Sequence, residues 1–287
     1  MKQQPQETWE REVEAEIRRQ LHEKHILPST SSSSSSPVDM HITDGANANT
    51  RSSCQSPSSS PDLDTTDISE DSSIEENSFD EPQRPFLIGV VGIPGSGKST
   101  SAGILKRHLE KEYGTMVLPM DGYHLSKADL AKFPDPEAAL YRRGAPDTFD
   151  VEAFLMDLCR IKYGSENKIG LPDWDHAVGD PIPNGHLFDR SKHDIVIVEG
   201  LYLLHDGDGW ESAKDFFNLT IGIHANIDQC VSRLKVRNRV IPGYTPEEID
   251  IRCERIDRAN AVIVQKSETR ANYLVQSLTS QREDMIF

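Results

Sequence analysis

Five runs of apolar and β-branched residues punctuate the chain after residue 85. FLIGVVG at 86–92 and DIVIVEG at 194–200 are almost continuously apolar, which is typical of strands buried on both faces of a parallel sheet. Three further runs have a similar composition, at 115–121, 217–225 and 260–265. We predict a strand at each of the five positions.

Between these runs the apolar residues recur at helical spacing. We predict helices over 98–112, 151–164, 227–240 and 245–260. The last of them begins with a strong signal, because Thr245 suits the N-cap, Pro246 the first turn and Glu248 the third position. Strands that alternate with helices imply right-handed βαβ units and a parallel sheet covered on both faces. Residues 85–287 are therefore predicted to form one α/β domain.

The first 84 residues have a different pattern. A helix is predicted over 5–25, with one apolar stripe of residues spaced by four: Trp9, Val13, Ile17 and Leu21. Isolated helices of this length are marginal in water, so we expect it to fray alone; the alternative is docking on a partner or on the chain's own core. Residues 28–83 are rich in serine and acidic residues and include six consecutive serines. We predict that this segment is disordered, because it has too little apolar surface to offset the entropy of ordering.

Charge is unevenly distributed. The formal net charge is −16, and residues 1–83 hold 17 of the 47 acidic residues but 6 of the 31 basic ones. This balance argues against nucleic-acid binding and against anchoring to an anionic membrane, which both need a basic surface. The sequence contains neither an apolar run long enough for a membrane span nor a recognisable targeting segment. The four cysteines form no C-x-x-C pair. We expect a cytoplasmic protein whose acidic extension is a candidate site for a protein partner.

The strongest motif is GIPGSGKS at 92–99, which matches G-x-x-x-x-G-K-[ST] and lies between a predicted strand and a predicted helix. We therefore expect its residues and the following threonine to bind a nucleoside triphosphate: Gly92, Ile93, Pro94, Gly95, Ser96, Gly97, Lys98, Ser99 and Thr100. Lys98 would reach the β- and γ-phosphates, and the Ser99 hydroxyl would bind Mg²⁺. The motif thus predicts ATP and Mg²⁺ as cofactors, without saying what happens to the γ-phosphate.

Two acidic residues stand at the ends of predicted strands, where ligands bind in open α/β sheets. Asp121 is a candidate general base for an attacking hydroxyl; the alternative is a turn residue before Gly122. Glu199 is a candidate for holding Mg²⁺ through water or for orienting Lys98; the alternative is a strand-end acid facing solvent. Either acid could be the main contact of the metal ion.

The predicted helix 227–240 is rich in cations, with Arg233, Lys235, Arg237 and Arg239. Arginines on a mobile lid stabilise the charge of a phosphoryl group in transfer; the alternative is a solvated helix face. We prefer Arg237 and Arg239, because they lie nearest to the IPGYTP break at 241–246, which resembles a hinge. A GTPase signature of the N-K-x-D type is missing from the sequence, which favours a small-molecule kinase.

A polar and aromatic set suits the orientation of a phosphate acceptor: Tyr123, His124, Arg142, Asp173, Asp175 and His176. The segments that carry most of this set, MDGYH, RRGAPDTFD at 142–150 and LPDWDH at 171–176, occur in order with GIPGSGKST, VIVEGLYLL and the arginine-rich helix. This ordered set resembles the phosphoribulokinase/uridine kinase/pantothenate kinase superfamily over about residues 86–280.

The resemblance implies a P-loop kinase fold with a five-stranded parallel sheet of order 2-3-1-4-5. It implies transfer of the ATP γ-phosphate to a hydroxyl of a small metabolite, such as a nucleoside, a pantothenate-like compound or a sugar. By the same resemblance, Asp121 is the catalytic base, LPDWDH belongs to a hairpin near the acceptor, and Asn260 lies near the adenine. The alternative function is a P-loop ATPase that acts as a nucleotide-regulated switch for protein interactions.

Overall fold

The computed structural model describes residues 6–24, 26, 84–175, 177–241 and 243–277. The chain divides into two units, of which one joins Met1–Thr30 to Gln83–Phe287 and the other is Ser31–Pro82, and all of the described residues belong to the first. The segment predicted to be disordered, 28–83, lies outside the described residues. Its disorder and the division of the chain at residues 84 and 85 stay predictions.

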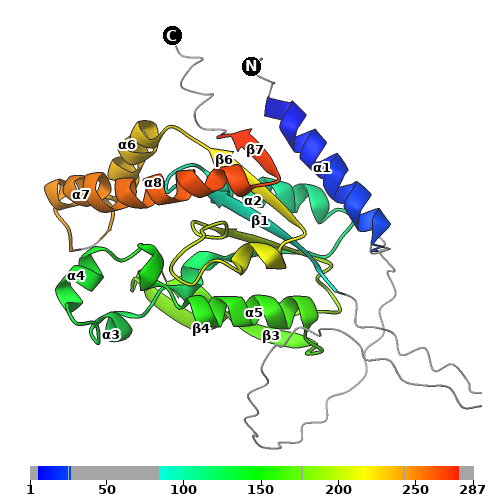
Figure 1. Cartoon of the computed structure of the whole chain (residues 1–287), viewed down its shortest axis with the longest axis horizontal. Coiled ribbons are helices and arrows are strands. Elements are labelled where there is room, and N and C mark those ends of the chain that lie inside the picture. Colours follow the sequence, from blue (N-terminus) through cyan, green and yellow to red (C-terminus); the bar gives the residue numbers. More distant parts are fainter. Residues whose placement is uncertain (1–5, 25, 27–83, 176, 242, 278–287) are drawn as a thin grey trace, which may run out of the picture. The chain divides into compact units, whose positions relative to one another are not determined.

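A five-stranded parallel sheet forms the centre of the first unit (Figure 1). Its strands are β1 (Phe86–Gly92), β2 (Thr115–Pro119), β5 (Ile195–Gly200), β6 (Leu219–His224) and β7 (Tyr273–Gln276). Their order is β2-β5-β1-β6-β7, and every pairing between neighbours is parallel. Counted within this sheet alone, the order is 2-3-1-4-5, so the predicted fold class is confirmed.

The strand predicted over 260–265 is wrong. These residues lie within a helix, and the fifth strand is β7, which follows it. The buried residues of the helix are Asn260, Ala261, Val264 and Ser267, which is helical spacing. Val262, which a strand buried on both faces would cover, is 41% exposed. A short apolar run does not distinguish a strand from a helix by periodicity.

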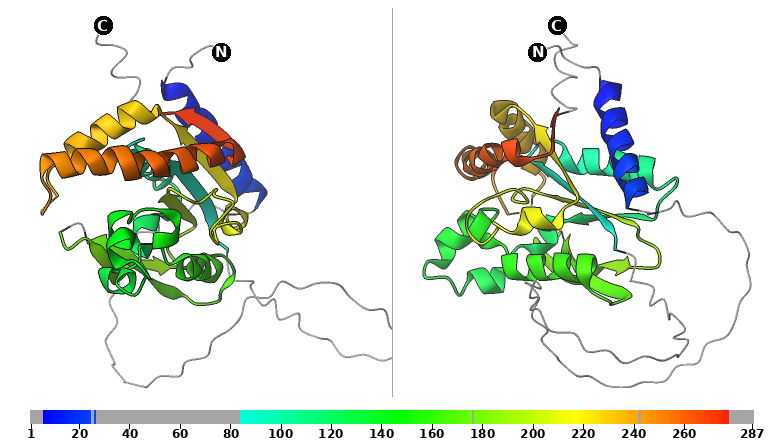
Figure 2. Two further views of the ribbon diagram at one scale, coloured as in Figure 1. Left: turned by 60° about the vertical axis from the view of Figure 1, so that its left-hand side comes forward. Right: turned by 45° about the vertical axis from the view of Figure 1, so that its right-hand side comes forward.

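Helices lie on both faces of the sheet (Figures 1 and 2). They are α1 (Gln6–Glu23), α2 (Lys98–Leu109), α3 (Lys127–Leu130), α4 (Pro136–Tyr141), α5 (Val151–Tyr163), α6 (Ile227–Asn238), α7 (Pro246–Arg252) and α8 (Arg258–Ser267). Alternate residues of β1 divide between the faces: Leu87 and Val91 pack in the cluster that includes residues of α5 and α8. Ile88 and Val90 pack in the cluster that includes residues of α1 and α2.

Helix α1 is present where the sequence predicts a helix, and it packs on the chain's own core. Val13, Ile17 and Leu21 are buried in one cluster with residues of α2 and of the sheet. Glu14 pairs with His108 of α2 at 3.0 Å, and Arg18 pairs with Glu112 just beyond it. The structure therefore supports docking on the core rather than a helix that stands alone.

Two further elements shape the edge of the sheet at which β1 ends. Strands β3 (Lys168–Asp175) and β4 (Asp180–Asp189) form a separate antiparallel hairpin, as the resemblance implied for 171–176.

The capping signal at Thr245 is also confirmed, because its side chain accepts from Glu248 N while Glu248 accepts from Thr245 N. Within the described residues, every helix is too short or too polar to cross a membrane.

Candidate active site

The loop between β1 and α2 has the backbone geometry of an anion-binding site. Gly95 and Gly97 have φ angles of 79° and 88°, which residues with a side chain rarely adopt. A Cβ atom on Gly92 would lie 2.6 Å from Ser96 Oγ, so the loop closes tightly on itself. Gly97 is the N-cap of α2 and gives no side-chain cap, which leaves the first N–H groups of the helix available to a phosphate.

Glu199, the penultimate residue of β5, is a buried acid beside this loop. Its Oε1 atom accepts a hydrogen bond of 2.9 Å from Ser99 Oγ, and its Oε2 atom is buried without a partner among the described residues. Burial raises the pKa of Glu199, the charge of Lys98 opposes this rise, and the charge of Asp121 adds to it. Two candidate acids, the lysine and the serine are thus close enough to interact.

Asp121 lies in a 3-10 turn, Met120–Tyr123, that directly follows β2. Because Pro119 of β2 is in register with Glu199, Asp121 stands at the same edge of the sheet as the phosphate loop. The hairpin approaches the next residue, since a Cβ atom on Gly122 would lie 2.6 Å from the carbonyl oxygen of Pro172. A side chain at residue 122 would push the hairpin away from Asp121.

His124 links Asp121 to the hairpin. Its Nδ1 atom lies 2.8 Å from the carbonyl oxygen of Asp121, and a carbonyl only accepts, so Nδ1 carries the proton. Its ring lies 4.0 Å from that of Phe149 and 4.6 Å from that of Trp174, between ring centroids. Burial lowers the pKa of His124, against the opposing charge of Asp121. A neutral ring therefore keeps Nε2 as a hydrogen-bond acceptor.

The other predicted acceptor residues do not all join this group. Tyr123 is buried in the core, where its hydroxyl donates to Asp157 of α5 at 3.1 Å, so the structure places it away from the acceptor side. Asp175 accepts from Ala177 N and Val178 N and thus shapes the turn of the hairpin. His176 lies outside the described residues.

Two more of them lie close to ionisable side chains. Arg142 pairs with Asp147 and lies over the ring of Phe133, on an exposed part of the surface. Asp173 lies 3.1 Å from His186 Nε2 across the hairpin and accepts from Trp174 N. The backbone of Asp173 lies beside Gly122, since its nitrogen would lie 3.0 Å from a Cβ atom on that glycine. Asp173 is therefore near the turn that holds Asp121.

Arg143, rather than Arg142, ties the hairpin to the acceptor side. It donates to the carbonyl oxygens of Gly179 at 2.7 Å and Leu125 at 2.6 Å. It also pairs with Asp180 at 2.7 Å, with 8% of its side chain exposed. Its guanidinium lies 4.7 Å from the centroid of the Trp174 ring. The sequence placed two arginines side by side but held no signal for which one is buried.

Among the arginines of α6, Arg233 contacts the phosphate loop. Its Nη1 atom donates to the carbonyl oxygen of Gly95 at 2.9 Å. The preferred pair lies elsewhere: Arg237 donates to Asn238, and Arg239 lies 3.6 Å from Asp250 with 53% of its side chain exposed. Arg233 is three residues after Cys230, whose carbonyl oxygen lies against Gly95, so both residues lie on the face of α6 that meets the loop. The sequence alone held no signal for which face that is.

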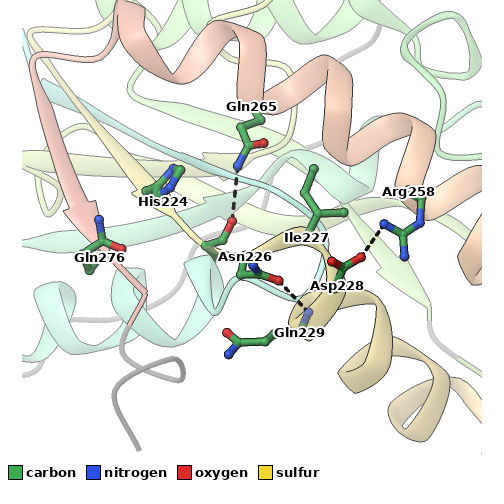
Figure 3. A pocket seen from close by; sticks show the side chains of 9 residues that line it. His224, Asn226, Ile227, Asp228, Gln229, Arg258, Gln265 and Gln276 are labelled. Carbon is green, nitrogen blue, oxygen red and sulfur yellow. Dashed lines mark hydrogen bonds and ion pairs between the residues drawn. The ribbon is translucent and has the colours of Figure 1, made fainter. Parts of the chain in front are cut away.

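A pocket of about 560 Å³ opens where β6 and β7 end (Figure 3). Four of its nine lining residues carry amide side chains: His224, Ala225, Asn226, Ile227, Asp228, Gln229, Arg258, Gln265 and Gln276 line it. The Oε1 atom of Gln229 is buried without a partner among the described residues. Ser277 joins the pocket to the phosphate loop, because its N–H donates to His224 O at 2.8 Å and its hydroxyl to Ser96 O at 2.6 Å.

Asn260, expected near the adenine, does not line this pocket. It is buried in α8, and its Nδ2 atom would lie 3.5 Å from a Cβ atom on Gly144. Helix α8 thus presents Asn260 to the segment after α4, while Gln265 of the same helix reaches the pocket and donates to Ala225 O at 3.3 Å. Which face of α8 points toward the pocket decides whether Asn260 or Gln265 reaches it, and the sequence did not show which face that is.

Comparisons with known proteins place this arrangement in a family. Residues 87–283 match the model of the phosphoribulokinase / uridine kinase family. The Schizosaccharomyces pombe protein named "Putative uridine kinase C227.14" is 34% identical over 202 residues, which cover 68% of this chain and 85% of that protein.

Solved structures agree with this match. A structure named "putative fructose transport system kinase", from Silicibacter sp. TM1040, is 28% identical with a TM-score of 0.60 and covers 67% of this chain and 90% of its own. YFH7 from Saccharomyces cerevisiae has a TM-score of 0.58 over 68% of this chain and 93% of its own, and at 22% identity it supports the fold alone.

Proposed function

Because the chain belongs to the phosphoribulokinase/uridine kinase family, we propose that it transfers the γ-phosphate of ATP to a hydroxyl group of a small metabolite. One observation carries the proposal: Lys98, Ser99, Asp121 and Glu199 interact at the edge of the sheet where the phosphate loop begins. Phosphoryl transfer depends mainly on positioning and on charge stabilisation, and this group supplies both.

ATP would lie across the ends of β1, β6 and β7. The loop and Lys98 would hold its phosphates, and the base would enter the amide-lined pocket of Figure 3. The unpartnered Oε1 atom of Gln229 would accept a hydrogen bond from the amino group of adenine, since an amide oxygen is an acceptor. Arg233 already lies at the loop, whereas Arg237 and Arg239 would reach a γ-phosphate only after the helix moves.

The residues present fit Mg²⁺. Ser99 Oγ and the two oxygens of Glu199, one of them unpartnered, are hard oxygen ligands beside the phosphate loop. Among the described residues, no three His, Cys, Asp or Glu side chains gather to hold a metal ion by themselves, as expected for an ion bound mainly by phosphates and water. When bound, the ion neutralises charge on the β- and γ-phosphates.

Asp121 would accept the proton of the attacking hydroxyl. It stands at the strand end beside Glu199, and the neutral ring of His124 fixes its backbone. The hairpin behind Gly122 would bound the acceptor on the side away from ATP. Since the relatives are named "Putative uridine kinase C227.14" and "putative fructose transport system kinase", nucleosides and sugars are the first acceptors to test.

The test is a transfer assay with γ-labelled ATP and a panel of uridine, D-fructose, D-glycerate and pantothenate. We expect labelled product with one acceptor class, and none with Lys98→Ala as the matched control. Labelled free phosphate without labelled product, over the whole panel and a wider set of nucleosides and sugars, would contradict the proposal. That result would favour the nucleotide-regulated switch.

A further inference from the structure

Strand β7 brings one serine against the phosphate loop. The strand pairs with β6, and its last residue, Gln276, lies opposite His224 (Figure 3). Ser277 follows directly. Its N–H donates to the carbonyl oxygen of His224 at 2.8 Å, and its hydroxyl donates to the carbonyl oxygen of Ser96 at 2.6 Å. Ser277 is fully buried, so its hydroxyl makes this bond away from competing water.

The end of β6 gives this contact a firm support. The side chain of His224 pairs with Glu268 at 2.9 Å, and Glu268 is buried. The phosphate loop also packs closely on this end of the strand, since a Cβ atom on Gly92 would lie 3.1 Å from Cβ of Ile223. Ser277 is therefore bonded both to the loop and to the strand against which the loop packs.

The bond to Ser96 fixes the direction of one peptide group in the loop. The peptide between Ser96 and Gly97 is trans, and in a planar trans peptide the C=O and the N–H point in opposite directions. Because its oxygen is bound to Ser277, this peptide directs the N–H of Gly97 away from Ser277. Backbone N–H groups of such a loop bind phosphate oxygens. Ser277 thus sets the orientation of one phosphate-binding group.

The peptide between Ser96 and Gly97 depends on a donor from outside the loop. Ser96 Oγ is buried without a hydrogen-bond partner among the described residues, so the serine side chain does not anchor its own backbone there. Gly97, with a φ angle of 88°, has no side chain, and glycine rotates more freely than other residues. Arg233 holds the carbonyl oxygen of Gly95, which belongs to the preceding peptide. Loss of the Ser277 hydroxyl would therefore let the Gly97 N–H change its direction.

We propose that Ser277 is a positioning residue for the phosphate loop, whose hydroxyl holds the Ser96 carbonyl so that the Gly97 N–H faces the phosphates of ATP. This inference rests on the ATP binding in the proposed function, and it adds a residue that lies 181 positions beyond Ser96 in the chain. It also gives the short edge strand β7 a role, because the strand carries Ser277 to the loop.

The test measures binding and so needs no identified acceptor. Displacement of a fluorescent ATP analogue from the full chain, in the presence of Mg²⁺, gives the Kd of ATP and the Kd of inorganic tripolyphosphate. Tripolyphosphate carries the three phosphates without the base. Loss of one neutral hydrogen bond should weaken binding about 5-fold. We expect Ser277→Ala to raise both Kd values by this same factor.

Three further variants separate this role from a general loss of packing. Ser277→Thr keeps the hydroxyl and should bind both probes like the wild type. The matched control is Ser267→Ala, which also removes a buried hydroxyl that donates to a carbonyl oxygen, that of Val264 at 2.8 Å within α8; both Kd values should stay unchanged. If Ser277→Ala melts below the assay temperature, Ser277→Cys replaces it, because the thiol fills the same space and is a weak donor.

The outcomes separate the two proposals. If the wild type binds neither ATP nor tripolyphosphate, the proposed function fails and this inference falls with it. If the wild type binds both and Ser277→Ala binds both equally well, the inference is overturned and the proposed function stands. If Ser277→Ala weakens the binding of ATP but not of tripolyphosphate, Ser277 acts on the base pocket instead of the loop, and the inference is again overturned.

Discussion

At the scale of single residues, the candidate site combines charges whose environments differ. Asp121 lies at a partly exposed turn, whereas Glu199 is buried with one oxygen unpartnered. The two acids therefore suit different tasks. Asp121 is placed to take a proton from a substrate, and Glu199 is placed to act with Ser99 and Lys98 beside the phosphate loop. Separate substitutions distinguish these tasks.

Asp121→Asn should keep ATP binding and lose transfer. General-base catalysis contributes roughly 10²- to 10⁴-fold, so we expect kcat to fall by at least about 100-fold at an unchanged ATP KM. Steady-state kinetics with the acceptor found in the panel measures both constants. The control is Asp206→Asn, an exposed acid near Arg270. Wild-type turnover by Asp121→Asn would disprove its role as the base.

Glu199→Gln should abolish transfer while it stabilises the fold. Burial raises the pKa of Glu199 above its ordinary value of 4.5, so the folded state favours the neutral form, and ionisation at neutral pH costs stability. We expect a higher Tm at pH 7, where roughly 2–4 °C corresponds to about 1 kcal/mol in a domain of this size. Exposed Glu211→Gln is the control.

The same variant has a defined pH dependence. The stability that neutral Glu199 contributes is present below its ordinary pKa and is lost as the pH rises through the raised value. The Tm difference between Glu199→Gln and the wild type should therefore be small near pH 4.5 and grow toward pH 7. Thermal melts across that range measure it, and a difference that shrinks with rising pH would contradict the assignment.

At the scale of elements, the hairpin β3–β4 depends on Arg143. This side chain holds Gly179, Leu125 and Asp180 together. Arg143→Ala would leave the two carbonyl oxygens without their donor and would remove the ion pair with Asp180, so we expect the free energy of unfolding to fall by about 2 kcal/mol and the acceptor KM to rise. Thermal melts and kinetics measure these effects. Lys132→Ala, which removes an exposed pair with Asp129, should change the stability by less than about 1 kcal/mol.

The elements also show how much of the fold could be predicted from the sequence. Four strands, the phosphate loop and the start of α7 followed from local patterns, because each has a signal within a few residues. The fifth strand did not, since β7 is four residues long and its Leu274 is 52% exposed. The choice between Arg233 and Arg237 depends on which face of α6 packs on Gly95, and that contact joins residues distant in the chain.

At the scale of the whole molecule, α1 is part of the core although a long segment separates it from β1. Ile17 is fully buried against residues of α2 and the sheet. Ile17→Ala should lower the free energy of unfolding by about 2–5 kcal/mol, which urea denaturation measures. Arg19→Ala, on the exposed side of α1 with pairs to Glu16 and Glu23, is the control. Equal effects of the two changes would contradict the docking of α1.

The position of α1 bears on how a shorter recombinant fragment should be cut. A fragment that begins at residue 85 would lack α1 and would expose Leu105 and Leu109, which pack in one cluster with it. An exposed apolar patch of this kind promotes aggregation. A fragment that keeps residues 6–26 and replaces the stretch up to residue 84 with a flexible glycine-serine tether should stay monodisperse. The tethered fragment is therefore a better starting point for crystallisation or NMR than the fragment that begins at residue 85.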